Sequence, residues 1–98
     1  MKNLSGLVIA FALLMTAVSG AAADGKQIYA QNCAGCHNGL SPKLGDKAAW
    51  EPRIKRGLDA LVASAIKGKG GMPPRGGHIA LPDDDIKAAV EYMVSQAR

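Results

Sequence analysis

Two cysteines and a histidine lie within five consecutive positions of the chain and have the spacing of a prosthetic-group attachment site. Cys33 and Cys36 are separated by two residues, and His37 follows directly. On one helical turn, two thiols at this spacing can reach both vinyl groups of a porphyrin and form thioethers, while the adjacent imidazole turns under the ring to bind iron. The C-x-x-C-H pattern therefore predicts one haem c, attached through Cys33 and Cys36, with His37 as an iron ligand.

Three other uses of this cysteine pair fit the sequence less well. A thioredoxin-like dithiol has the same C-x-x-C spacing but belongs to a βαβ fold, and we find no convincing alternating strand. A disulfide between Cys33 and Cys36 would close too small a loop to stabilise the protein much. A zinc site would need both thiols and His78, but the spacing is wrong for a zinc finger and a fourth ligand is missing.

A second axial ligand is expected from the loop around Met72. Thioether sulfur stabilises reduced iron, and beyond the first 23 residues the chain has two methionines, Met72 and Met93. Met93 belongs to an apolar helical stripe and is interpreted as a core residue. Met72 lies in a loop whose glycines allow close approach to the haem and whose prolines stiffen the backbone. The sequence favours His37 and Met72 as the axial pair; ligation by His37 and His78 is the alternative, because imidazole also binds iron well.

Residues 1–23 have the three parts of a secretory signal peptide. Lys2 gives a basic start, residues 7–18 are apolar, and small residues lead to a peptidase site after Ala23. The apolar stretch has 12 residues, too short for a membrane-spanning helix, which needs about 20; an uncleaved anchor is the alternative. We therefore expect export to the periplasm and a mature domain of residues 24–98.

The mature domain is too small for a large enzyme fold and needs a stabilising group. Its 75 residues contain three aromatic side chains, Tyr29, Trp50 and Tyr92, and cores of this size rarely outweigh the entropy lost on folding without a metal, cofactor or disulfide. The domain carries 11 Lys and Arg against 8 Asp and Glu, without a basic stripe interleaved with aromatics. This composition indicates a mixed surface that does not bind nucleic acid, and we expect a monomer.

Caps, breakers and apolar positions predict an all-α domain of about four short helices. Asp24 and Asp46 are candidate N-caps, and the acidic run Asp83–Asp85 favours a helix N-terminus electrostatically. We expect helices over residues 24–33, 46–50, 58–67 and 83–97, with a further helical turn from Pro52 to Gly57. Residues 68–81 are expected to form a 14-residue loop without regular structure, a length that usually indicates function.

Residues on both sides of the haem motif follow the pattern of a known family. The matching positions are Gly25, Tyr29, residues 42–46, Trp50, Arg53, the helix from Leu58, residues 72–77 and residues 88–93. On these positions the mature chain resembles the class I monohaem cytochromes c, and within them the small bacterial cytochrome c-five branch. Many members of this branch carry an extra cysteine pair where this chain has residues 78–81, so this domain is expected to depend more on its haem for stability.

The resemblance implies a small fold wrapped around one covalently attached haem. In such a fold an N-terminal helix crosses a C-terminal one, so that Gly25 and Tyr29 would meet Ala89 and Tyr92. The resemblance also implies His37 and a methionine as the axial ligands.

The function that these observations favour is that of an exported electron carrier without catalytic residues. Its partners would be redox donor and acceptor proteins, including membrane-bound complexes. Two protein ligands would fill both axial positions of the iron and leave none for oxygen or peroxide. One alternative is a haem subunit of a larger redox complex. Another is a peroxidase-like haem enzyme, in which His78 would be the only candidate for a distal acid and base.

Further polar residues are candidates for contacts around the haem. Trp50 could donate its indole N–H to a haem propionate, helped by Arg53, or could simply belong to the core. Basic residues in segments expected to border the haem edge could steer an acidic partner, or could be ordinary solvated charges: Lys43, Lys67, Lys69 and Arg75.

Overall fold

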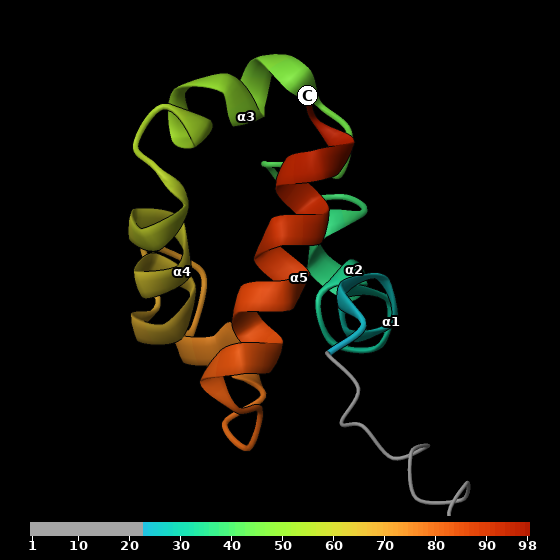
Figure 1. The fold of residues 1–98 in the computed structure, drawn as a ribbon, viewed down its shortest axis with the longest axis vertical. Helices are drawn as coiled ribbons and strands as arrows, with labels where there is room; N and C mark the ends of the chain where they lie inside the picture. Colours follow the sequence, from blue (N-terminus) through green and yellow to red (C-terminus); the bar gives the residue numbers. More distant parts are fainter. Residues whose placement is uncertain (1–22) are drawn as a thin grey trace, which may run out of the picture.

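The computed structural model describes residues 23–98, so the expected signal peptide lies outside the described residues except for Ala23 (Figure 1). The elements in chain order are α1 (Gly25–Asn32), α2 (Ala34–His37), α3 (Lys47–Ile54), α4 (Leu58–Lys67), the 3-10 helix η2 (Pro74–Gly77) and α5 (Asp83–Gln96). Within residues 23–98 an isolated two-residue bridge is the sole β-type pairing, which confirms the all-α class. No helix in this range is long and apolar enough to cross a membrane.

The helix boundaries with a strong local signal lie where the sequence predicts them. The Asp24 carboxylate accepts from the backbone N–H groups of Lys26 and Gln27 at 3.1 and 3.2 Å. The Asp46 carboxylate likewise accepts from the N–H of Ala49 at 3.2 Å. These caps satisfy N–H groups that have no partner within the helix.

One expectation about the helices was wrong. The helix capped by Asp46 does not end at Trp50 but continues through Pro52 to Ile54 as a single helix, α3. Proline lacks the N–H that would bond to the carbonyl four residues earlier, so α3 continues through Pro52 with one backbone hydrogen bond fewer. The C-x-x-C-H segment forms the short helix α2, in agreement with the helical turn expected for it.

The loop of residues 68–81 is more ordered than expected. The backbones of Lys69 and Met72 exchange two hydrogen bonds of 2.9 and 3.0 Å, and η2 follows immediately. Gly68, with a φ of 89°, ends α4 and turns the chain into this pairing. This left-handed conformation favours glycine, and a Cβ here would lie 2.8 Å from the backbone nitrogen of Pro74.

The long helix α5 is the centre of the packing (Figure 1). It contacts α1 on one side and α4 on another, while α4 in turn contacts α3 and η2. In Figure 1, α3 lies beyond the ends of both α4 and α5 and close to the C-terminus. The haem motif at the end of α1 and the loop after α4 are thereby placed around α5.

Helices α1 and α5 cross at Gly25 with very little space between them. A Cβ at Gly25 would overlap the carbonyl oxygen of Ala88 and lie 3.2 Å from the Cβ of Tyr92. Nearby, the rings of Tyr29 and Tyr92 are tilted by 45° with centroids 5.5 Å apart, a favourable separation for aromatic pairs. The crossing implied by the resemblance is therefore present, except that Ala88 rather than Ala89 approaches Gly25.

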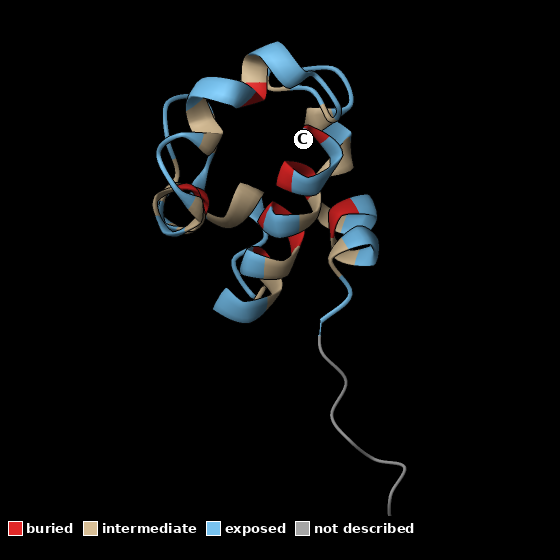
Figure 2. Cartoon of the chain, turned by 45° about the horizontal axis from the view of Figure 1, so that its top comes forward, coloured by how far each residue is buried: buried red, intermediate tan, exposed pale blue. Residues whose placement is uncertain are grey.

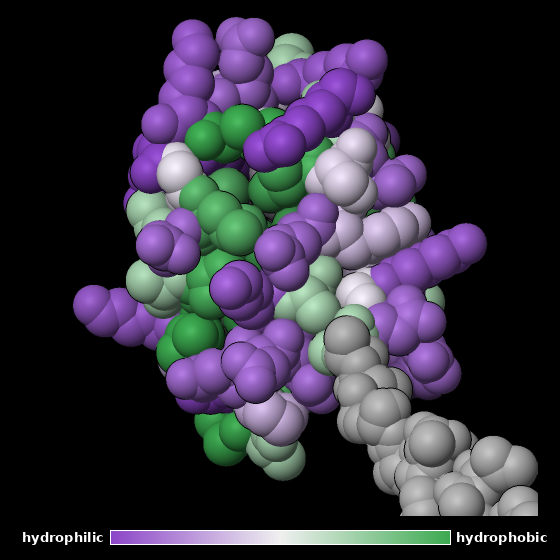
Figure 3. Space-filling model, in the orientation of Figure 1, coloured by the Kyte–Doolittle hydropathy of each residue, from purple (hydrophilic) through white to green (hydrophobic). Residues whose placement is uncertain are grey.

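The buried residues line the inner side of the helices (Figure 2). All are hydrophobic, and residues 23–98 contain no buried polar or charged side chain. They are Tyr29, Trp50, Leu61, Ala65, Ile86, Ala89, Val90, Met93, Val94 and Ala97. Figure 3 shows hydrophobic side chains continuing as a band at the surface in the region of α4 and α5. The core is thin, as expected, because none of the described side chains is less than 2% exposed.

The close crossing predicts that Gly25→Ala destabilises the protein. The added methyl group would force α1 away from Ala88, and overpacking of this kind costs about 1–3 kcal/mol. Urea unfolding of the purified protein measures the loss. Gly39→Ala is the matched control, because no atom lies within 4 Å of a Cβ built there. An equal loss of stability in both variants would contradict this account of the crossing.

Candidate functional site

The two cysteines and the histidine share one helical turn that begins where α1 ends. The carbonyl oxygen of Cys33 accepts from the backbone N–H groups of Cys36 and His37 at 3.2 and 3.0 Å. Cys33 is half-buried and Cys36 is exposed, and both are free thiols. Burial raises the pKa of the Cys33 thiol, and Cys36 nearby raises this pKa further. Both effects favour the neutral thiol over the thiolate until the sulfur is alkylated.

The His37 imidazole is held by a backbone carbonyl. Its Nδ1 lies 2.9 Å from the carbonyl oxygen of Pro42. Because a carbonyl oxygen can only accept, Nδ1 must carry the proton, which leaves the lone pair of Nε2 available to a metal. The N–H of Leu44 donates to the carbonyl oxygen of His37 at 2.9 Å and closes the intervening loop.

Tyr29 ties the end of this turn to α1. Its hydroxyl donates to the side-chain oxygen of Asn38 at 2.9 Å. Burial is the main cause that raises the pKa of Tyr29, with contributions from Cys33 and Tyr92. The hydroxyl therefore remains protonated at neutral pH and keeps its role as a donor.

Three of the four predicted site residues line one apolar cleft. Cys33 and His37 come from the helical turn, and Met72 comes from the loop after α4. The complete lining is Cys33, His37, Ala65, Met72, Arg75, Gly76, Ile86, Ala89, Val90 and Met93. The exposed Cys36 does not line this cleft. Histidine nitrogen and thioether sulfur are both ligands of haem iron, and an apolar lining suits a porphyrin, so the donor set and its surroundings fit a haem.

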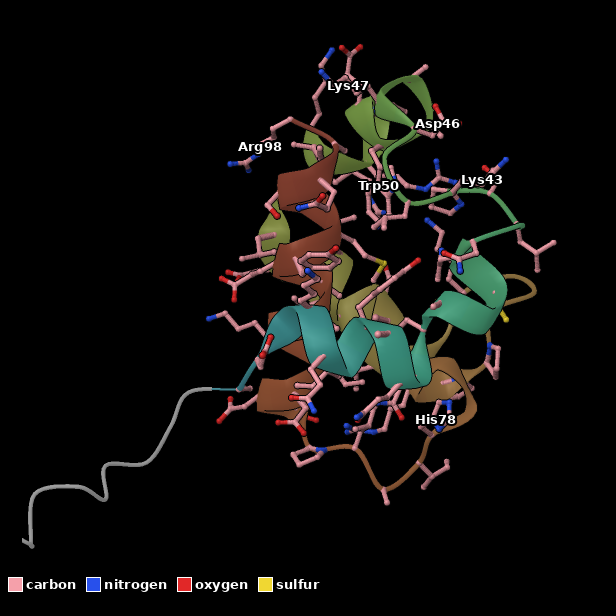
Figure 4. All side chains as sticks on the ribbon, turned by 90° about the vertical axis from the view of Figure 1, so that its right-hand side faces the viewer. Lys43, Asp46, Lys47, Trp50, His78 and Arg98 are labelled. Carbon is pink, nitrogen blue, oxygen red and sulfur yellow. The ribbon has the colours of Figure 1, made fainter. Side chains whose placement is uncertain are left out.

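His78 lies away from this cleft. It follows η2, is exposed, and is absent from the cleft lining, and Figure 4 shows it at the end of the molecule remote from Asp46 and Lys47. No group of three His, Cys, Asp or Glu side chains in residues 23–98 is arranged to hold a metal ion. The geometry therefore does not support a zinc site made by Cys33, Cys36 and His78.

Trp50 is a core residue whose indole N–H already has a protein partner. The indole Nε1–H donates to the carbonyl oxygen of Lys43 at 3.0 Å (Figure 4), so its hydrogen bond is satisfied within the protein. Arg53 bonds back to its own helix, because one guanidinium nitrogen donates to the carbonyl oxygen of Ala49 at 2.6 Å. The interpretation of Trp50 as core is confirmed by its 4% exposure.

The sequence did not indicate several residues that complete the site. Met93 is buried, as expected, but it also lines the cleft beside Ala89. Their i, i+4 spacing on α5 could have indicated a shared face towards the site. The role of the Pro42 carbonyl has no sequence signal, because it depends on how the loop after α2 folds back.

The sequence of this chain matches those of known proteins. Residues 20–93 match the family model described as "Cytochrome C oxidase, cbb3-type, subunit III". The chain is 44% identical to cytochrome c-555 of Chlorobaculum tepidum, with 99% of this chain and 98% of that protein covered. It is 43% identical to cytochrome c5 of Azotobacter vinelandii, with 76% of this chain and 95% of that protein covered.

A solved structure has the same fold. A chain in a crystal structure of an electron transfer complex of nitrite reductase with cytochrome c matches with a TM-score of 0.73 and 47% identity, covering 76% of this chain and 95% of that chain. Both relatives named above are cytochromes and neither carries the name of an enzyme, which agrees with the expectation of an electron carrier. With the C-x-x-C-H turn, the all-α fold and these matches taken together, the chain belongs to the family of small class I cytochromes c.

Proposed function

We propose that this protein is an exported carrier of single electrons with one haem c. Cys33 and Cys36 would hold the haem covalently, and His37 and Met72 would be its axial ligands. The observation that carries this proposal is the apolar cleft lined jointly by Cys33, His37 and Met72. When bound, haem c supplies an iron centre that takes up and releases one electron.

The site residues are suited to these roles. The hydrogen bond from Nδ1 of His37 to Pro42 fixes the tautomer and the ring orientation, and such partners also raise the basicity of a ligand imidazole. Met72 is held by its backbone pairing with Lys69. Its neutral, soft sulfur favours ferrous iron and so raises the reduction potential. Because both axial positions would be filled by the protein, peroxide would find no open coordination position.

The peroxidase-like alternative is not favoured by the geometry. It requires a distal acid and base above an open iron, and His78 was the candidate for this role. His78 is exposed and does not line the cleft. The same observation speaks against His37 and His78 as the axial pair.

Replacement of Met72 is expected to open the iron. Met72→Ala should abolish the weak far-red sulfur-to-iron band of the ferric protein, lower the midpoint potential and allow rapid carbon monoxide binding to the ferrous form. The native protein should bind carbon monoxide slowly. Absorption spectroscopy, redox titration and stopped-flow mixing measure these three effects.

Two control variants test the assignment of Met72. Met93→Leu removes the other thioether that lines the cleft with little change in volume, and should retain the far-red band. His78→Ala should change little. If His78→Ala opens the iron while Met72→Ala leaves the spectrum unchanged, the axial pair is His37 and His78, and the assignment of Met72 is wrong.

Export is expected to end in cleavage after Ala23. Mass spectrometry of the purified protein should give residues 24–98 plus one haem. Ala23→Leu should block processing because the peptidase requires a small residue at this position. Ala22→Leu is the matched control, since the middle position of the A-x-A site is not restricted in this way. A mass equal to the full chain without haem would contradict the proposal.

The proposed partners are redox proteins, and basic side chains would guide them. Residues 43–75 carry eight Lys and Arg against three Asp and Glu, whereas residues 78–98 carry two against four. Of the basic residues expected at the haem edge, Arg75 is paired with Asp83 at 2.6 Å. The exposed Lys43, Lys67 and Lys69 are therefore the better candidates for steering an acidic partner.

Association with an acidic redox partner should slow as ionic strength rises, because salt screens long-range attraction. The double variant Lys43→Gln/Lys69→Gln should lower the association rate at low salt by about two- to fivefold. The control Lys87→Gln, which changes an exposed lysine of α5, should have little effect. Stopped-flow kinetics provide the measurement, and equal rates for all three proteins at low salt would remove the electrostatic claim.

A haem subunit of a larger redox complex is the second candidate function. The description of the matching family model names an oxidase subunit, whereas the whole-length match to cytochrome c-555 favours a separate small protein. Size-exclusion chromatography of a membrane-free native extract distinguishes the two: a carrier elutes as a monomer, and a subunit elutes with its complex.

A further inference from the structure

The turn after Met72 holds Arg75 in a backbone conformation that is unfavourable for arginine. Arg75 has a φ of 55° and a ψ of 27°, and it is the sole non-glycine residue with positive φ in residues 23–98. Left-handed backbone of this kind disfavours any residue with a Cβ, whereas glycine adopts it freely. Gly76 and Gly77, which follow directly, have φ values of 63° and 90°. We therefore expect the side chain of Arg75 to make contacts that offset its unfavourable backbone conformation.

The Arg75 side chain joins the middle of the loop to the beginning of α5. One guanidinium nitrogen donates to the carbonyl oxygen of Leu81 at 2.7 Å, and another donates to the carboxylate of Asp83 at 2.6 Å. Leu81 is near the end of the loop, and Asp83 is the first residue of α5. The rigid, planar guanidinium can hold both acceptors at once, which the single ammonium group of lysine does less well.

The same residue forms part of the cleft. Arg75 lines it together with His37 and Met72, and its side chain is only 23% exposed. The turn also lies against the Met72 side chain, because the Met72 methyl carbon is 3.8 Å from a Cβ built at Gly76. The other attachments of the loop, at Gly68 and Lys69, lie on the side of α4. Among the described residues, the side-chain hydrogen bonds that join η2 to Leu81 and to the start of α5 are therefore those of Arg75.

We propose that Arg75 is a positioning residue: it clamps the loop of residues 72–81 to the start of α5 and thereby holds the Met72 thioether at the iron. This inference rests on the proposed role of Met72 as an axial ligand. Arg75 would not bind the iron itself. It would act on Met72 through the backbone of the loop. Arg75 follows Met72 by three residues, so a displacement of the Met72 backbone out of the cleft would also strain the contacts of Arg75.

Asp83 provides a clean way to break the clamp. Asp83 is the member of the acidic run that pairs with Arg75, and Asp84 next to it makes no ion pair within the described residues. Asp83→Asn and Asp84→Asn change the net charge equally, and both positions lie in the first turn of α5. A difference between these variants therefore reports the contact with Arg75 and not the charge of the helix terminus.

The test measures how fast imidazole replaces the protein ligand in the ferric, haem-loaded protein, together with the far-red band and the free energy of unfolding. Arg75→Gly removes the clamp and also relieves the left-handed backbone, so stability should change little. The rate of imidazole binding should rise about tenfold in Arg75→Gly and several-fold in Asp83→Asn, with a weaker far-red band, because charge-assisted hydrogen bonds that hold the loop are lost. Asp84→Asn should remain within about twofold of the native rate.

Several outcomes would overturn the clamp. Native imidazole rates in both Arg75→Gly and Asp83→Asn would show that Arg75 does not hold the loop, while the role of Met72 could still stand. An equal rise in Asp84→Asn would show an effect of net charge and not of the contact. If Met72→Ala retains the far-red band and the native imidazole rate, the proposed axial ligand itself fails, and that failure is separate from the behaviour of the Arg75 variants.

Discussion

The absence of a side chain at Gly25 lets α1 approach α5 closely, and the position of the haem-binding turn follows from that approach. Any larger residue would meet the carbonyl oxygen of Ala88. Because α1 has only eight residues and Cys33 follows directly, its crossing point with α5 also determines where the motif lies. The rings of Tyr29 and Tyr92 add a second contact between the same helices, and the Tyr29 hydroxyl continues this link to Asn38. The close backbone contact at Gly25 thus determines where the C-x-x-C-H turn lies relative to α5.

The cleft combines parts of the chain that have no local relation to one another. Cys33 and His37 come from the turn after α1, Met72 from the loop after α4, and the apolar residues Ala89, Val90 and Met93 from α5. Each polar member has a partner that restrains it: His37 bonds to Pro42, and Arg75 bonds to Leu81 and Asp83. The apolar residues determine the shape of the cleft, and the hydrogen bonds fix the orientation of the His37 and Arg75 side chains.

Signals confined to a few neighbouring residues predicted this structure well. The caps at Asp24 and Asp46 needed only one carboxylate beside a helix start, and the C-x-x-C-H turn needed only its own spacing. The features that the sequence did not indicate depend on distant contacts. The indole N–H of Trp50 bonds to the carbonyl oxygen of Lys43 because the loop before α3 folds back under the ring. The preferences of single residues for helix or loop do not predict this contact. The sequence did not indicate the clamp made by Arg75. Its unfavourable backbone conformation is local, whereas the stabilising bond is to Asp83, eight residues further along the chain.

The apolar character of the interior has a consequence for the speed of the proposed electron exchange. Residues 23–98 contain no buried polar or charged side chain, and the polar groups of the cleft, His37 and Arg75, are each fixed by hydrogen bonds. A unit change of charge in such surroundings meets few dipoles that are free to turn, and dipoles already in place need no rearrangement. The reorganisation energy of the protein should therefore be small, so that a modest difference in potential between partners suffices to drive fast transfer.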